Sequence, residues 1–160
     1  RILSIIGDVY YTTLQQMRKL VFLVAAANTF GGRQAKEDLL LIAQGQVAWE
    51  DDKAEEAGEY LFCDTNLIVM KVWSDHKYGE TDPWILEELE KRHYDFYLLG
   101  NIDLIWRPDP QREHPKMRKH FFDIYENYLK EHNLPYGIVS GIEDLRVKCA
   151  QDLIEDFFKK

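Results

Sequence analysis

Short apolar runs alternate with longer amphipathic stretches along this sequence, and this alternation constrains the fold more than any other feature. Apolar runs of strand length separated by helices are typical of a parallel sheet that helices cover on both faces. We therefore predict an α/β fold with three layers and a mostly parallel sheet of about five strands. The expected strands are Ile2 to Gly7, Val21 to Ala27, Tyr60 to Cys63, Asp95 to Ile102 and Tyr136 to Val139. The second of them ends in three alanines, which also suit a helix.

Amphipathic periodicity and capping residues predict helices over 35–58, 66–73 and 82–93, a fourth between 115 and 133, and a last one after 140. Asp82 and Pro83 are typical of a helix start, because a carboxylate accepts hydrogen bonds from the first turn. Ser140 and Glu143 have the spacing of a capping box. The side chains that the last helix is expected to turn to the core are Leu145, Cys149, Leu153 and Phe157.

Composition narrows the classes of partner and location. The chain has 28 acidic and 20 basic residues, and its formal charge of −8 repels phosphate backbones, so we expect no nucleic-acid partner. The longest apolar run, Leu20 to Ala27, is too short for a membrane helix, which needs about 20 residues. The first residues lack the pattern of a secretory leader. Two distant cysteines, Cys63 and Cys149, favour a reducing, cytoplasmic location, with a single disulfide between them as the alternative.

Polar residues or glycine follow three of the expected strands, as Gly7-Asp8, Asp64-Thr65 and Ser140-Gly141. The carboxyl ends of parallel strands meet at one edge of the sheet, which is where open α/β sheets bind ligands. Asp64 is the best chemical candidate, because a carboxylate there can hold a Mg²⁺-bound water or take a proton from a hydroxyl group. The alternative is that Asp64 caps the helix that follows.

The segment from Trp106 to Pro115 is rich in prolines and charges. Arg107, Arg112 and Arg118 are suited to phosphate binding, because guanidinium forks match phosphate oxygens. Alternatively, the segment is a stiff loop with internal salt bridges. Considered by itself, without other parts of the sequence, the segment favours this second interpretation. The loop from Ile142 to Arg146 follows the last strand, where nucleotide-binding sheets often contact a base, although any strand-to-helix turn looks similar.

A phosphate-binding loop needs the pattern G-x-x-x-x-G-K-[ST], whose backbone amides and lysine hold the phosphates. The first expected strand is followed by Gly7-Asp8-Val9-Tyr10-Tyr11-Thr12-Thr13, which lacks the second glycine and the lysine. Asp8 stands where backbone amides would face an anion, and its carboxylate would repel phosphate. By themselves, these residues predict an ordinary strand-to-helix turn.

From Lys36 onward, several motifs in combination resemble the P-loop kinase domain of the nicotinamide riboside kinase type, found in bacterial regulators of NAD biosynthesis. The motifs that carry the resemblance are EDLLLIAQGQ at 37–46, LFCDT at 61–65, KVWS at 71–74, KYG at 77–79, RPDPQREHP at 107–115 and Ser140-Gly141. The resemblance implies a single P-loop NTPase domain of the nucleotide-kinase kind over 1–160. It also implies ATP and Mg²⁺ as cofactors and transfer of the γ-phosphoryl group to the ribose hydroxyl of nicotinamide riboside.

The resemblance further implies roles for individual residues. Asp64 would be the catalytic carboxylate near the acceptor hydroxyl and would contact the metal together with Thr12. A lid around residues 106–118 would close over the phosphates. The residues that would contact phosphate or nucleotide are Gly7, Thr12, Thr13, Arg107, Arg112 and Arg146.

The first quarter of the chain departs from the family pattern. Thr12-Thr13-Leu14 resembles a remnant of the family's Lys-Thr-Thr-Leu, but Val21 to Phe30 is apolar where the family is polar. Smaller departures are Asn66, Gly100 and Gly137, where the family has a carboxylate or a bulkier apolar residue. Because the changes gather around the expected pocket, they suggest that the pocket has been rebuilt, by evolution or by design.

Two functions follow from these observations. In the first, the protein is a nicotinamide riboside kinase relative whose phosphoryl transfer is weak or lost, because the loop lysine is absent. In the second, the scaffold has become a binding protein or catalyst for an apolar or aromatic small molecule and needs no cofactor. Tyr10, Tyr11, Phe22 and Trp73 would then line the pocket. Alternatively, Val21 to Phe30 is a homodimer surface, or the altered segment only repacks the core.

Overall fold

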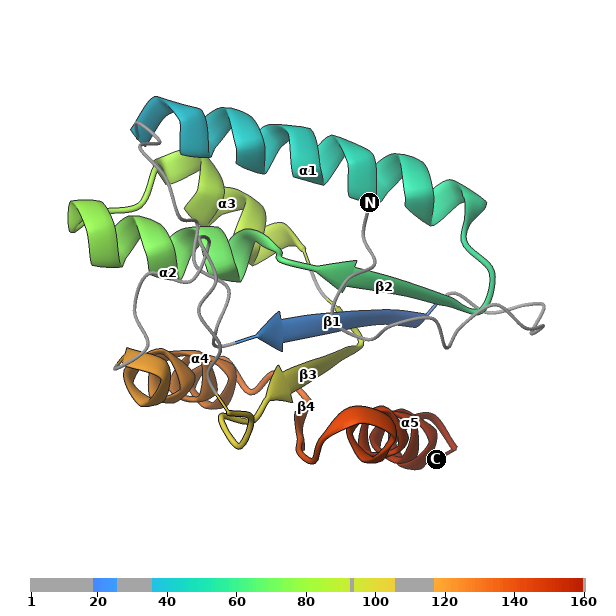
Figure 1. Ribbon diagram of the computed structural model, residues 1–160. Helices are drawn as coiled ribbons and strands as arrows, with labels where there is room; N and C mark the ends of the chain where they lie inside the picture. Colours follow the sequence, from blue (N-terminus) through green and yellow to red (C-terminus); the bar gives the residue numbers. More distant parts are fainter. Residues whose placement is uncertain (1–18, 26–35, 93, 106–116, 160) are drawn as a thin grey trace.

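A computed structural model gives the fold and describes residues 19–25, 36–92, 94–105 and 117–159. Figure 1 shows α1, α2 and α3 grouped on one side of the strands and α5 on the other. The elements in chain order are β1 (Lys19–Ala25), α1 (Lys36–Glu56), β2 (Tyr60–Asp64), α2 (Leu67–Tyr78), α3 (Pro83–Lys91), β3 (Phe96–Gly100), α4 (Arg118–Glu131), β4 (Tyr136–Val139) and α5 (Glu143–Phe158).

The described strands form one parallel sheet in the order β2-β1-β3-β4. β1 is central, and its Leu23 lies opposite Asp64 of β2 and Leu98 of β3. The chain runs from β1 to β2 in one direction and from β3 to β4 in the other, so the strand order reverses between β1 and β3. The prediction of an α/β fold with a parallel sheet is confirmed. The expected strand Ile2 to Gly7 lies outside the described residues.

Alternate side chains of the strands enter two hydrophobic cores, as the pleat of a strand requires. On one face, Cys63 of β2 and Tyr97 and Leu99 of β3 pack with α2 and α4. On the other face, Phe96 and Leu98 of β3 pack with α5. The predicted arrangement of a sheet between two helical layers is therefore confirmed for the part of the chain that the structure describes.

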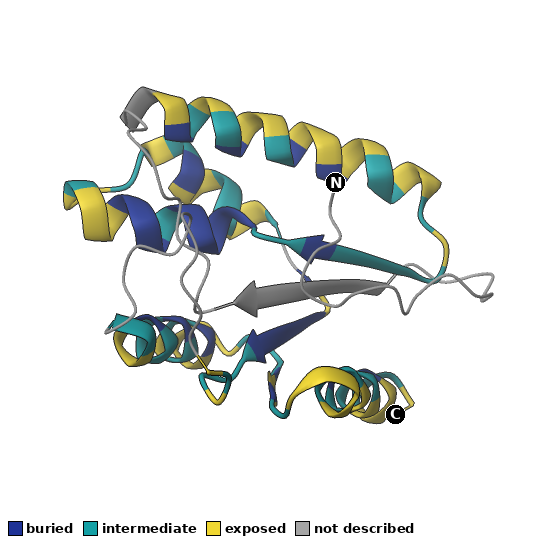
Figure 2. Ribbon diagram, viewed as in Figure 1, coloured by how far each residue is buried: buried dark blue, intermediate teal, exposed yellow. Residues whose placement is uncertain are grey.

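Helix α1 packs on other helices more than on the sheet. Its buried side chains contact α2 and α3 in a third core, and Figure 2 shows its outer side exposed. The residues of this core are Leu39, Ala43, Val47, Leu67, Met70 and Ile85. In the second half of this helix, Asp51 and Asp52 are exposed, whereas the side chain of Glu50 is buried.

Local capping explains where α2 and α3 begin. The side chain of Asn66 accepts hydrogen bonds from the backbone N–H groups of Ile68 and Val69 at 2.8 and 3.4 Å. Asp82 accepts one from Trp84 N–H at 2.9 Å, which confirms the predicted start of α3. Helix α2 runs beyond its predicted end and stops at Gly79, whose φ of 76° is the left-handed conformation that glycine adopts most easily.

The start of α5 differs from the prediction. The N-cap residue is Ile142, which makes no side-chain capping bond, so Ser140 and Glu143 do not form a capping box. The hydroxyl of Ser140 instead accepts a hydrogen bond from the side-chain amide of Asn101 at 2.9 Å. Ser140 thus pairs with a residue that follows the neighbouring strand β3 and not with the first turn of α5.

The buried face of α5 is also rotated from the predicted one. Leu145 is 68 % exposed and does not reach the core. Ala150 and Ile154 are the buried residues of this helix, while Leu153 and Phe157 pack against the core from partly buried positions. Within the described residues, no helix combines the length and the apolar character that crossing a membrane requires.

Candidate functional site at the carboxyl edge of the sheet

Open α/β sheets bind ligands at the carboxyl ends of the strands where the strand order reverses, and here the reversal lies between β1 and β3. Three described segments reach this edge. They are Asp64-Thr65 at the end of β2, Asn101 to Asp103 after β3, and Ser140-Gly141 after β4. We therefore treat the edge as the candidate site.

Asp64 is the last residue of β2 and lies beside the central strand β1. Partial burial raises the pKa of the Asp64 carboxyl above its ordinary value, and a hydrogen bond from the Thr65 side chain opposes this increase. The helix that follows is capped by Asn66, so the alternative in which Asp64 serves as the cap is wrong. The Asp64 carboxylate thus stands at the edge without a role in starting α2.

The corner after Asp64 is conformationally unusual. Thr65 has a φ of 67°, in the left-handed region that β-branched residues rarely adopt. The next residue, Asn66, is completely buried, and its amide nitrogen has no hydrogen-bond partner among the described residues. A buried unpaired donor costs about 1–3 kcal/mol, so packing around α2 must hold this corner in place.

On the other side of β1, Arg146 of α5 joins the segments that follow β3 and β4. Its guanidinium donates to the Asp103 carboxylate at 2.8 Å, to the Gly141 carbonyl at 3.0 Å and to the Asn101 carbonyl at 2.9 Å. The planar fork of arginine suits several acceptors at once. We call Arg146, Asp103, Asn101, Gly141 and Ser140 the carboxyl-edge network.

The charge of Asp103 is stabilised within this network. Slight burial would raise the pKa of its carboxyl, but the Gly141 N–H, which donates at 2.7 Å, and the Arg146 guanidinium together lower the pKa below its ordinary value. The Asn101 backbone also donates to the Val139 carbonyl at 2.8 Å. The network therefore fixes the two segments relative to each other at the edge of the sheet.

The two parts of the edge are separated by the central strand. Neighbouring strands lie about 4.8 Å apart, so β2, which carries Asp64, is about 10 Å from β3. The edge thus offers a partly buried carboxylate on one side of β1 and a braced pair of turns on the other. A ligand at the reversal point would lie between them.

Several predicted site residues can be placed in the structure. Arg146 lies at the carboxyl edge, where its guanidinium contacts protein acceptors, and its role toward a nucleotide stays a prediction. Arg118 donates to the carbonyls of Leu104 and Ile102 at 2.7 and 3.0 Å, which braces the chain after β3. Trp73 is 3 % exposed and stacks on Phe121 with ring centroids 5.3 Å apart, so it lies in the hydrophobic core rather than on a pocket wall.

The remaining predicted site residues are Phe22, which lies in β1, and a group outside the described residues. The backbone of Phe22 lies inside β1, opposite Cys63 and Tyr97, rather than at the end of that strand. The predicted site residues that lie outside the described residues are Gly7, Tyr10, Tyr11, Thr12, Thr13, Arg107 and Arg112, together with most of the lid at 106–118. Their roles stay predictions.

Part of the predicted homodimer surface, Val21 to Phe30, belongs to β1. Residues 21–23 of β1 are paired on both sides, with β2 and with β3, so they offer no open strand edge to a second copy of the chain. Residues 26–30 lie outside the described residues, and the homodimer stays a prediction.

Cys63 and Cys149 are both free, and burial raises the pKa of the Cys63 thiol to about 12, which makes it a poor nucleophile.

The sequence analysis missed Asn101 and Asp103, which anchor the carboxyl-edge network. They lie just after β3, which ends at Gly100, whereas the strand expected from the sequence extends to Ile102 and contains Asn101. With the strand end at Gly100, the rule about polar residues at strand ends would select them. No local pattern indicates that Asp103 pairs with Arg146, because the two residues are 43 positions apart in the chain.

The donor groups at the edge can be compared with the needs of Mg²⁺. Among the described residues, no three His, Cys, Asp or Glu side chains are grouped as a metal cage would require. Mg²⁺ keeps several waters and is often held by one or two carboxylates together with substrate phosphates. A single carboxylate such as Asp64 fits that kind of site.

An all-parallel α/β sheet with its polar groups gathered at the carboxyl edge defines a class of proteins that bind small molecules at a switch point. A family model described as AAA domain matches residues 11–145, and the chain belongs to this family of the P-loop NTPase type. The match supports the P-loop kinase and ATPase superfamily. No curated protein matches the chain.

Proposed function

We propose that this protein binds ATP with Mg²⁺ at the carboxyl edge of its sheet and is a nicotinamide riboside kinase relative in which phosphoryl transfer is weak or lost. The observation that carries the proposal is the place of Asp64. A partly buried carboxylate at the end of a strand next to the central strand is not used to cap a helix. The family assignment and the kinase-like motifs from Lys36 onward support the nucleotide class of ligand.

In this proposal, Asp64 holds the metal or orients the acceptor hydroxyl. A bound Mg²⁺ would supply charge that neutralises the phosphate oxygens during transfer. The carboxyl-edge network would keep the turns after β3 and β4 in place for the nucleotide. Because the pKa of Asp64 is raised, ionisation of this carboxyl, and with it metal binding, becomes more complete as the pH rises above the ordinary value of 3.8.

Weak transfer follows from the sequence. The pattern G-x-x-x-x-G-K-[ST] occurs nowhere in the 160 residues. Removing one preorganised donor to the developing charge reduces a rate by about 10²–10³-fold. We therefore expect nucleotide binding without efficient chemistry.

The test combines binding and turnover in the full chain. Mg-ATP should raise the melting temperature of the wild type, and Asp64→Asn should reduce that rise. Asp156→Asn, on the exposed side of α5, is the matched control and should keep it. Nicotinamide riboside phosphorylation, followed by chromatography, should be far below ordinary kinase turnover of about 1–100 s⁻¹. No thermal shift with Mg-ATP would refute the binding proposal, and turnover in that range would refute the loss of transfer.

A further inference from the structure

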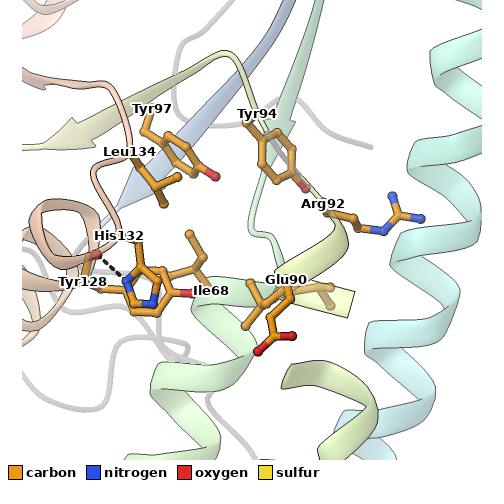
Figure 3. Close-up of a pocket in the computed structure, with 10 residues that line it drawn as sticks. Ile68, Glu90, Arg92, Tyr94, Tyr97, Tyr128, His132 and Leu134 are labelled. Carbon is orange, nitrogen blue, oxygen red and sulfur yellow. Dashed lines mark hydrogen bonds between the residues drawn. The ribbon is translucent and has the colours of Figure 1, made fainter. Parts of the chain in front are cut away.

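A pocket lies away from the carboxyl edge, between the amino end of β3 and the helices α2, α3 and α4. Its volume is about 220 Å³. Tyr94 and Tyr97 stand at the start of β3, and Leu134 comes just before β4. Leu67 and Ile68 at the start of α2 also line the pocket, but neither Asp64 nor any residue of the carboxyl-edge network does, so its lining is distinct from the candidate nucleotide site. Figure 3 shows the side chains of Tyr94, Tyr97 and Leu134 facing Ile68 and Tyr128 across the pocket.

Two of the polar groups around the pocket are bound to α1. The Arg92 guanidinium turns toward α1, where it donates to both oxygens of Asp51 at 2.7 and 2.8 Å (Figure 3). The Tyr94 hydroxyl donates to Glu50 at 2.6 Å. Apart from the exposed Glu90, the lining is therefore mainly leucine and isoleucine side chains and aromatic rings.

The ring of His132 lines one side of the pocket. It stacks on the Tyr128 ring, with centroids 4.0 Å apart, and its Nδ1 is 2.8 Å from the Tyr128 carbonyl. Since a carbonyl only accepts, Nδ1 carries the proton in this contact. The stacked pair gives the pocket a flat aromatic wall, and aromatic pairs prefer offset-stacked or edge-to-face contacts with further rings.

The volume of the pocket and the polarity of its lining indicate which ligands fit. An apolar cavity of about 150 Å³ holds benzene, so a pocket of about 220 Å³ has room for one larger or two fused rings. An anionic ligand would lose its hydration without gaining an ionic partner, because the Arg92 guanidinium is already paired with Asp51 and Glu88. The carboxylate of Glu90, which also lines the pocket, would repel an anion, and it is exposed, so its own charge stays hydrated. We propose that this pocket binds a neutral fused-ring aromatic molecule of about the size of indole. The site goes beyond the proposed nucleotide function and does not depend on it.

The experiment is a titration of the full chain with indole, without nucleotide, followed by ¹H–¹⁵N correlation spectra. Saturable shifts should centre on Tyr97 and Leu134, and nuclear Overhauser effects should connect the indole ring to the side chains of these two residues. No saturable shift up to the solubility limit of indole would overturn the proposal. Overhauser contacts confined to other residues would overturn it as well.

Two variants and a second ligand sharpen the test. Leu134→Trp fills the pocket and should weaken indole binding at least tenfold, whereas Leu86→Trp, on an exposed position of α3, should leave it unchanged. Indole-3-acetate should bind at least tenfold more weakly than indole because of its charge. Equal binding by Leu134→Trp, or equal binding of the acetate, would contradict the proposed site. If Leu134→Trp does not fold, the Overhauser contacts in the wild type decide.

Discussion

A polar network lies at each end of β3, and the two networks differ in how they stabilise a carboxylate. At the amino end, Glu50 is 7 % exposed and accepts hydrogen bonds from the Tyr94 hydroxyl at 2.6 Å and the Gln46 amide at 3.2 Å. We call these three residues the amino-end network. At the carboxyl end, the more exposed Asp103 contacts the guanidinium of Arg146 directly.

The difference shows how burial and charge compete. Burial raises the pKa of Glu50, and the hydrogen bonds from Tyr94 and Gln46 with the charge of Arg92 do not offset it. Burial is the largest single influence on Asp103 as well, but the backbone N–H of Gly141 and the cation of Arg146 together outweigh it and lower the pKa. Neutral donors satisfy a buried carboxylate, whereas a direct cation also keeps it ionised.

The largest effect is expected from Arg146→Ala. The substitution removes the donor to Asp103 and to two backbone carbonyls, and it should lower the free energy of unfolding by about 2–3 kcal/mol. Urea denaturation measures this loss. Lys148→Ala is the control on the same helix, because its exposed pair with Asp152 should matter little. Equal losses in the two variants would mean that the carboxyl-edge network does not brace the fold.

The next effect should come from the amino-end network. Glu50→Ala leaves the buried hydroxyl of Tyr94 without its acceptor and should cost about 2 kcal/mol in the free energy of unfolding. Glu50→Gln keeps an acceptor oxygen and should lose less. The same denaturation experiment compares them, and a loss that is no greater for alanine than for glutamine would argue against the hydrogen bond.

The pH dependence should have opposite signs in the two networks. The raised pKa of Glu50 means that its contribution is fully present below the ordinary value of 4.5 and is lost as the pH rises through the folded-state pKa. The lowered pKa of Asp103 means that its contribution is present above 3.8 and is lost as the pH falls through the folded-state pKa.

Denaturation of wild type, Glu50→Gln and Asp103→Asn between about pH 3 and pH 7 tests these signs. The stability of the wild type relative to Glu50→Gln should decrease toward neutral pH. Its stability relative to Asp103→Asn should decrease toward acid pH. Parallel trends in the two comparisons would contradict the distinction between the networks.

The smallest effect is expected from Ser140→Ala. It removes one partly buried hydrogen bond from Asn101 and should lower the free energy of unfolding by about 0.5–1 kcal/mol. A combination with Arg146→Ala shows whether the two contacts act together. A double variant whose loss equals the sum of the single losses would indicate that Ser140 lies outside the carboxyl-edge network.

Local sequence signals predicted much of the fold. The Asp82-Pro83 start of α3 and the strands around Phe62, Leu98 and Ile138 appear where they were expected. The predicted capping box at the start of α5 was wrong, because Ser140 pairs with Asn101, in the segment after β3, instead of within its own turn. When a side chain can form a hydrogen bond either within its own turn or with a neighbouring segment, the packing of the protein decides which partner lies within reach.

The candidate site was predicted to a smaller extent. Asp64 could be selected because a polar residue at the end of an apolar strand lies at the edge of a parallel sheet. The aromatic pocket could not, because its walls come from α2, α3, α4 and β3, which are distant in the sequence. Periodicity identifies the inner side of each helix but not what the inner sides enclose together.

The sequence by itself determined the strands, most helix ends and the position of Asp64 at a strand terminus, because these depend on neighbours within a few residues. Only the tertiary structure decided that β1 is central, that Glu50 pairs with Tyr94 across 44 residues and that Arg146 pairs with Asp103. Burial and ion pairing depend on which surfaces meet, and chain-wide packing sets that choice.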